Sequence, residues 1–109
     1  MPTLAGADRP PEELHFEAGD VIFEQGSRGD LVYFVDAGEV EIYRQRSDGT
    51  EEPITTITAG NYFGELGATL NLPRSATARA LTAATLTSHT TRHFRRRFPS
   101  DPNSLEVTP

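Results

Sequence analysis

Cysteine is absent from the 109 residues, which excludes disulfides, thiolate metal sites and thiol nucleophiles and fits a reducing compartment. Lysine is also absent, so all ten basic residues are arginines. No apolar run approaches the ~18 residues that span a bilayer, and the N-terminal stretch lacks the apolar segment of a signal peptide. We therefore expect a soluble, cytoplasmic domain that does not insert into a membrane.

The net charge of −6 argues against nucleic-acid binding by this domain, because neutralisation of phosphates dominates that kind of recognition. Four arginines gather near the C-terminal end, at Arg92, Arg95, Arg96 and Arg97. They could form an anion-binding patch, but we interpret them as the solvated face of a terminal helix. The three histidines, His15, His89 and His93, show no spacing typical of a metal site. We therefore predict neither a metal nor a cofactor.

Turn signals rich in Gly, Asp, Ser and Asn interrupt the chain about every 8 to 12 residues, which predicts an all-β sandwich or barrel. The expected strands lie between these turns, at 21–24, 31–36, 40–45, 53–58, 75–81 and 84–90. Asp48-Gly49 predicts a hairpin turn, because glycine supplies the positive φ that a tight turn needs. We predict one mainly β domain at 14–98, an antiparallel barrel of the jelly-roll (double-stranded β-helix) type. Flexible segments at 1–13 and 99–109 would flank it.

Two segments are predicted to be helical. The first is a short turn after Gly64, which Pro73 would end. The second lies near the C-terminus, with Thr91 as its N-cap and with Phe94 and Phe98 four residues apart on one face. We expect these two aromatic side chains to dock the helix on the barrel.

The stretch "GELGATLNLPRSA", residues 64–76, points to function. Gly64 lets the main chain come close to a ligand because it has no Cβ. The turn after it would offer unpaired N–H groups to an anion, and Gly67 is small enough to leave that turn open. Arg74 can bind a phosphate through two parallel hydrogen bonds, and the carboxylate of Glu65 fits as the acceptor of a sugar hydroxyl. The alternative is a surface salt bridge between Glu65 and Arg74, worth roughly 0–1 kcal/mol.

The run "FEAGDVIFEQGSRGDLVYFVDAGEVEIYR", followed by "YFGELGATLNLPRSATARA", resembles the cyclic nucleotide-binding domain family. That family shares a β-barrel with regulatory subunits of cyclic-AMP-dependent kinase, catabolite-activator transcription factors and cyclic-nucleotide-gated channels. The resemblance covers about residues 16–98. Several glycines fall in family positions, namely Gly19, Gly26, Gly29, Gly38 and Gly64. Its most specific part is the phosphate-binding cassette, which here is residues 64–76.

The resemblance implies a role for each cassette residue. Glu65 would bind the ribose 2′-hydroxyl and Arg74 the exocyclic phosphate oxygens, with Gly64 allowing close approach. Main-chain amides around Leu66 and Gly67, the Ser75 hydroxyl and the Ala76 amide would complete the site.

The implied function is that of a non-enzymatic regulatory module that binds a cyclic purine nucleotide. Cyclic AMP is favoured over cyclic GMP, because a threonine at the Ser75 position is what favours cyclic GMP in the family. The long helix that covers the base in the family has no counterpart in this sequence. The module would then be part of a larger protein or assembly, or a partner would supply the missing cover, or the site would be open and bind weakly. The alternative is a structural or interaction barrel within such an assembly, with a vestigial or unoccupied nucleotide site.

Overall fold

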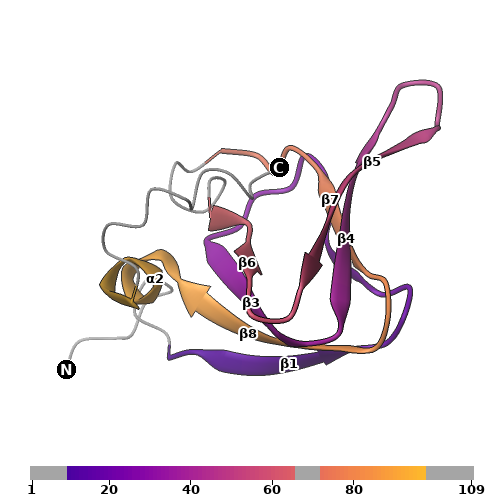
Figure 1. Ribbon diagram of the computed structural model, residues 1–109. Helices are drawn as coiled ribbons and strands as arrows, with labels where there is room; N and C mark the ends of the chain where they lie inside the picture. The colour runs from indigo at the N-terminus through magenta and orange to yellow at the C-terminus, as the bar shows by residue number, and fades with distance from the viewer. Residues whose placement is uncertain (1–9, 66–71, 98–109) are drawn as a thin grey trace.

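The computed structural model describes residues 10–65 and 72–97, with side chains described as far as Phe94. In this part of the chain, strands alternate with short turns and are followed by a helix (Figure 1). The strands are β1 (Glu12–Phe16), β2 (Val21–Phe23), β3 (Leu31–Ala37), β4 (Glu39–Gln45), β5 (Glu51–Thr58), β6 (Tyr62–Phe63), β7 (Thr77–Ala80) and β8 (Ala84–Thr90). The helix is α2 (Thr91–Arg97).

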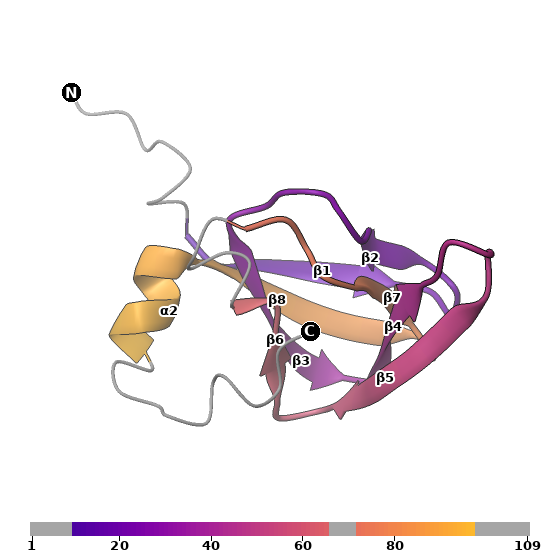
Figure 2. The same cartoon turned by 90° about the horizontal axis from the view of Figure 1, so that it is seen from above.

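The strands form two four-stranded sheets, in the orders β1-β8-β3-β6 and β2-β7-β4-β5. Neighbouring strands pair antiparallel throughout both sheets. The chain thus crosses repeatedly between the sheets, and Figure 2 shows them enclosing a common interior with α2 at the end of the molecule away from β5. The predicted fold class, an antiparallel jelly-roll barrel, is confirmed.

The core lies between the two sheets and follows the alternation of side chains along each strand. Val40 and Ile42 of β4, Leu86 of β8 and Phe63 of β6 are fully buried. Residues two apart in a strand point to the same face, so β4 contributes its apolar pair to the interior. Full burial of each such side chain stabilises the fold by roughly 1.5–3 kcal/mol.

The β4–β5 hairpin has the turn that the sequence predicts. Gly49 has a φ of 89°. The Oδ1 atom of Asp48 accepts hydrogen bonds from the main-chain N–H and the hydroxyl of Thr50, at 2.9 and 2.7 Å. Both features tighten the turn and fix the register of the two long strands.

Two strands lie outside the expected strand ranges. Strand β1 begins at Glu12, two residues before the expected start of the domain at residue 14. The short strand β6 leads into the turn at Gly64. Tyr43 is buried although it lies opposite the core face of β4, because the guanidinium of Arg79 covers its ring at 4.2 Å.

Helix α2 packs on the outer face of the sheet that contains β3 and β8. Phe94 is buried against Val32 and makes an edge-on contact with Tyr62 at 5.0 Å between ring centroids. The docking role of Phe94 is therefore confirmed, whereas Phe98 lies outside the described residues. The N-cap is Thr90, not Thr91, because the hydroxyl of Thr90 accepts the N–H of His93 at 3.3 Å.

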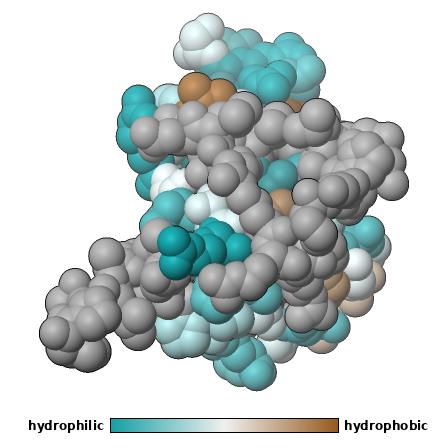
Figure 3. Space-filling view, turned by 90° about the vertical axis from the view of Figure 1, so that its left-hand side faces the viewer, coloured by the Kyte–Doolittle hydropathy of each residue, from teal (hydrophilic) through white to brown (hydrophobic). Residues whose placement is uncertain are grey.

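The side of the molecule on which α2 lies is largely hydrophilic where its residues are described (Figure 3). Arg92, the first arginine of the C-terminal group, is exposed. The side chains of the other three arginines lie outside the described residues. The interpretation of this arginine group as the solvated face of a helix therefore stays a prediction. None of the described helices is long and apolar enough to cross a membrane.

Candidate functional site

Arg74 lies at the entrance to β7 and is 5% exposed. Its main chain is fixed on both sides by the turn after β2. The N–H of Arg74 donates to the carbonyl of Ser27, and the N–H of Gly26 donates to the carbonyl of Arg74, both at 2.7 Å. These two main-chain hydrogen bonds hold the backbone of Arg74 and so set the direction of its side chain.

The guanidinium of Arg74 is held by main-chain carbonyls. Nη1 donates to the carbonyl of Gly64 at 2.7 Å, and Nη2 donates to the carbonyl of Leu31 at 2.8 Å. The same group stacks on the ring of Phe23, 4.2 Å from its centroid. A guanidinium carries five N–H donors, so these two bonds fix its position and leave further donors for another acceptor.

Burial lowers the pKa of Arg74, and Coulombic interactions with Tyr33 and Asp30 act in the opposite direction. An arginine stays charged at neutral pH even after such a shift. The site therefore contains a buried cation whose hydrogen bonds, among the described residues, go to neutral carbonyls. The negative charge of Asp30, in the turn before β3, thus acts on this cation.

Two glycines make room for the guanidinium. A Cβ atom on Gly64 would lie 2.8 Å from Nη1 of Arg74, and one on Gly29 would lie 3.1 Å from Nη2. Gly64 also has a φ of +88°, which side-chain-bearing residues rarely adopt. The sequence predicts that Gly64 admits a ligand, and in the structure the group that it admits is the side chain of Arg74.

Glu65 follows Gly64 and is 2% exposed. Its Oε1 atom forms no hydrogen bond with a described residue, while other interactions hold the residue. The structure thus brings Gly64, Glu65 and Arg74 together in one buried place. The alternative of a surface salt bridge between Glu65 and Arg74 is wrong, because both side chains are buried and Arg74 donates to carbonyls instead.

The remaining cassette residues are placed in part. Ser75 is exposed, and its carbonyl accepts a 3.4 Å hydrogen bond from Nε of Arg44. The side chain of Ala76 is fully buried in the core. Leu66 and Gly67 lie outside the described residues.

Sequence reasoning missed Phe23, Leu31 and Arg44 as neighbours of this site. Leu31 is 43 residues from Arg74, and Arg44 is 31 residues from Ser75. No local pattern signals such pairs, because the pairing of distant strands brings them together. The positions of Gly29 and Asp30 in a glycine-rich turn were the available hint.

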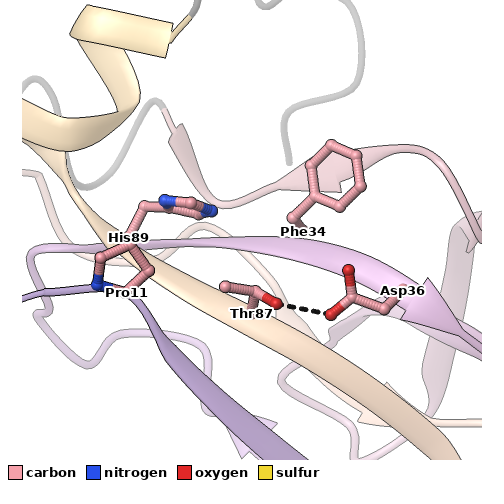
Figure 4. Close-up of a pocket in the computed structure, with 5 residues that line it drawn as sticks. All are labelled: Pro11, Phe34, Asp36, Thr87 and His89. Atoms are coloured by element: carbon pink, nitrogen blue, oxygen red, sulfur yellow. Dashed lines mark hydrogen bonds between the residues drawn. The ribbon is translucent and has the colours of Figure 1, made fainter.

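A hollow away from this site lies on the outer face of the sheet β1-β8-β3-β6 (Figure 4). It has a volume of about 190 Å³ and is lined by Pro11, Phe34, Asp36, Thr87 and His89. The hydroxyl of Thr87 donates to Asp36 across the strand pair. Since Val35 and Leu86 of the same strands face the core, this hollow is separated from Arg74 by the sheet. Within the described ranges, no three His, Asp or Glu side chains could hold a metal ion.

Comparisons with known proteins agree with the geometry. An uncharacterized ABC transporter ATP-binding protein of Mycobacterium tuberculosis is 48% identical over 98 residues, which are 90% of this chain and 30% of that protein. The cAMP-dependent protein kinase regulatory subunit of Emericella nidulans is 38% identical over 71 residues, 65% of this chain and 16% of that one. The chain thus spans less than a third of the length of these curated relatives.

The fold has a close counterpart among solved structures. The cAMP-bound structure of PfPKA-R (141–441) superposes with a TM-score of 0.74 and 36% identity, covering 79% of this chain and 30% of that one. The family model for the cyclic nucleotide-binding domain matches residues 13–101. The chain therefore belongs to the cyclic nucleotide-binding domain family.

Proposed function

We propose that this chain binds a cyclic nucleotide through Glu65 and Arg74. The observation that carries the proposal is that the buried guanidinium of Arg74 is bonded to the carbonyl of Gly64, the residue directly before the buried Glu65. A cyclic nucleotide presents a phosphate monoanion and a ribose hydroxyl next to each other. The guanidinium would donate to the exocyclic phosphate oxygens, and the Glu65 carboxylate would accept the 2′-hydroxyl.

The other cassette groups would complete the phosphate site. The main-chain amides of Leu66 and Gly67 would donate from the first turn after Gly64, and the Ser75 hydroxyl and Ala76 amide would donate from the other side. Exposure of Ser75 supports this role, since a hydroxyl that contacts ligand must be accessible before the ligand arrives.

Cyclic AMP is the proposed ligand in preference to cyclic GMP. Two observations support this choice. The matched solved structure of PfPKA-R is cAMP-bound, and relatives include regulatory subunits of cAMP-dependent protein kinase. Position 75 is a serine, whereas the family resemblance associates threonine there with cyclic GMP.

We further propose that the domain, over residues 14–98, is a regulatory module without catalytic activity of its own and works within a longer protein. The matched segments make up only 30% and 16% of these curated relatives, which supports that organisation. Ligand contacts at the cassette would then bias how α2 packs through Phe94, and the rest of the protein would respond. The cytoplasmic location stays a prediction.

Calorimetric titration of the purified chain with cyclic AMP and with cyclic GMP tests the proposal. Arg74→Lys and Glu65→Gln serve as variants, because each keeps the size and polarity of the side chain better than truncation to alanine. We expect micromolar or tighter binding of cyclic AMP by the parent chain and a large loss in both variants. No heat with either nucleotide at millimolar concentration would reject the proposal for this chain and favour the structural-barrel alternative.

A further inference from the structure

Arg44 lies on the same face of β4 as the core residues Val40 and Ile42. Val40 and Ile42 of this strand face the core, whereas Glu41 and Tyr43 contact Arg79 on the opposite face. Because side chains alternate along a strand, Arg44 continues the inner row beyond Ile42. Arg44 is exposed, so this row of side chains passes from the buried core to solvent.

The side chain of Arg44 reaches the phosphate-binding cassette. Its Nε donates to the carbonyl of Ser75 at 3.4 Å, which places the guanidinium beside the residue that follows Arg74. The residue opposite Arg44 on β5 is Glu52, but the carboxylate of Glu52 pairs with Arg46 at 3.4 Å. Within the described residues, the terminal N–H groups of Arg44 therefore make no hydrogen bond or ion pair.

Two guanidinium groups thus lie beside the main chain of Arg74 and Ser75, and they differ in burial and in hydrogen bonding. That of Arg74 is buried and bonded to two carbonyls, and that of Arg44 is exposed with its terminal donors available. We propose that Arg44 is a second cation of the site and donates to the phosphate of the bound cyclic nucleotide. This inference rests on the proposed function and extends it to a residue outside the cassette.

The phosphate is the expected partner for three reasons. Arg44 is anchored at Ser75, whose hydroxyl is itself proposed to bind the phosphate. A guanidinium with two free terminal nitrogens matches the spacing of phosphate oxygens. The chain carries a net charge of −6, so an exposed cation beside the cassette both attracts the anion and offsets the surrounding negative charge.

Titration of Arg44→Gln with cyclic AMP and with cyclic GMP, at low and at high salt, tests the inference. We expect a roughly tenfold increase in Kd for both nucleotides, the size of one charge-assisted hydrogen bond. The salt dependence of binding should also weaken, and Arg44→Lys should recover part of the affinity because it restores the charge. Arg46→Gln is the matched control: it removes an exposed arginine just beyond β4 that is paired with Glu52, and it should leave Kd unchanged.

The outcomes separate this inference from the proposed function. If the parent chain binds and Arg74→Lys does not, an unchanged Kd in Arg44→Gln overturns the role of Arg44 and leaves the function standing. A loss that affects only one of the two nucleotides overturns the phosphate contact, because the phosphate is common to both. If the parent chain binds neither nucleotide, both proposals fall. Thermal unfolding without ligand verifies that each variant is folded.

Discussion

Arg74 should stabilise the domain even in the absence of ligand. In the variant Arg74→Ala, the carbonyls of Gly64 and Leu31 lose their charged donor, and Phe23 loses the cation stacked on its ring. A buried acceptor without its donor costs roughly 1–3 kcal/mol, and the lost stacking adds roughly 0.5–1 kcal/mol. The variant no longer has to bury a guanidinium, which offsets part of this loss. We expect a net destabilisation of about 2–4 kcal/mol.

The assay is thermal or urea unfolding of the ligand-free chain. Circular dichroism is the suitable probe, because the chain contains no tryptophan. For a domain of this size, 1 kcal/mol corresponds to a change of roughly 4–8 °C in Tm, so the Tm of Arg74→Ala should fall by about 10–25 °C. Arg46→Ala, which removes an exposed arginine, should change the stability by less than about 1 kcal/mol.

A Tm of Arg74→Ala within about 2 °C of the parent value would refute this reasoning, since a shift that small corresponds to less than about 0.5 kcal/mol. It would mean that the two carbonyl bonds contribute nothing net and that the guanidinium can leave them freely. The expected result has a practical consequence for binding studies. Loss of ligand binding in Arg74→Ala would combine a lost contact with a weakened fold, which is why Arg74→Lys is the better variant for titration.

Three further changes test other parts of the structure. Gly64→Ala should destabilise the domain more than Gly60→Ala. Both positions have a positive φ, which costs a residue with a side chain roughly 1–2 kcal/mol. In addition, the new Cβ at Gly64 would lie 2.8 Å from Arg74, whereas the one at Gly60 would have no atom within 4 Å. Equal urea midpoints would contradict the close approach. Phe94→Ala should cost roughly 3–5 kcal/mol and speed hydrogen exchange in α2; unchanged protection there would show that other contacts hold the helix. Hydrogen bonds from the hydroxyl and the main-chain N–H of Thr50 lower the pKa of Asp48 from its ordinary value. Its carboxylate therefore stabilises the hairpin above the ordinary pKa of an aspartate, and this effect is lost as the pH falls through the lowered pKa. Asp48→Asn should therefore be less stable than the parent near neutral pH, with a difference that disappears in strong acid; a difference independent of pH would argue against the charge.

Much of the fold could be predicted because its signals are local. Alternating apolar residues at 40 and 42 define one face of β4, and Asp48-Gly49 fixes the turn that follows. The errors are also local in origin. The strand β1 has few apolar residues to mark its start, and the cap of α2 falls on the first of two consecutive threonines, which local sequence does not distinguish.

The candidate site could be predicted by residue type but not by arrangement. Glu65 and Arg74 were found because a carboxylate and an arginine around a glycine-rich turn suit a nucleotide. That Arg74 would donate to the carbonyl of Leu31 depends on how β3 pairs with its neighbours, and this register is a property of the whole barrel. The exposure of Arg44 beside Ser75 depends in the same way on the pairing of β4 with β7.

The overall charge of the chain is a poor guide to its affinity for an anion, because the described arginines differ in how they are compensated. Arg79 donates to the carboxylates of Glu41 and Glu51 and is neutralised locally. Arg74 and Arg44 instead donate to carbonyls, which leave the positive charge in place. A positive centre can therefore persist within a domain of net charge −6. The hydrogen bonds of Arg74 also fix its rotamer before any ligand arrives. Binding therefore loses less side-chain entropy than it would if the arginine were mobile in the free domain.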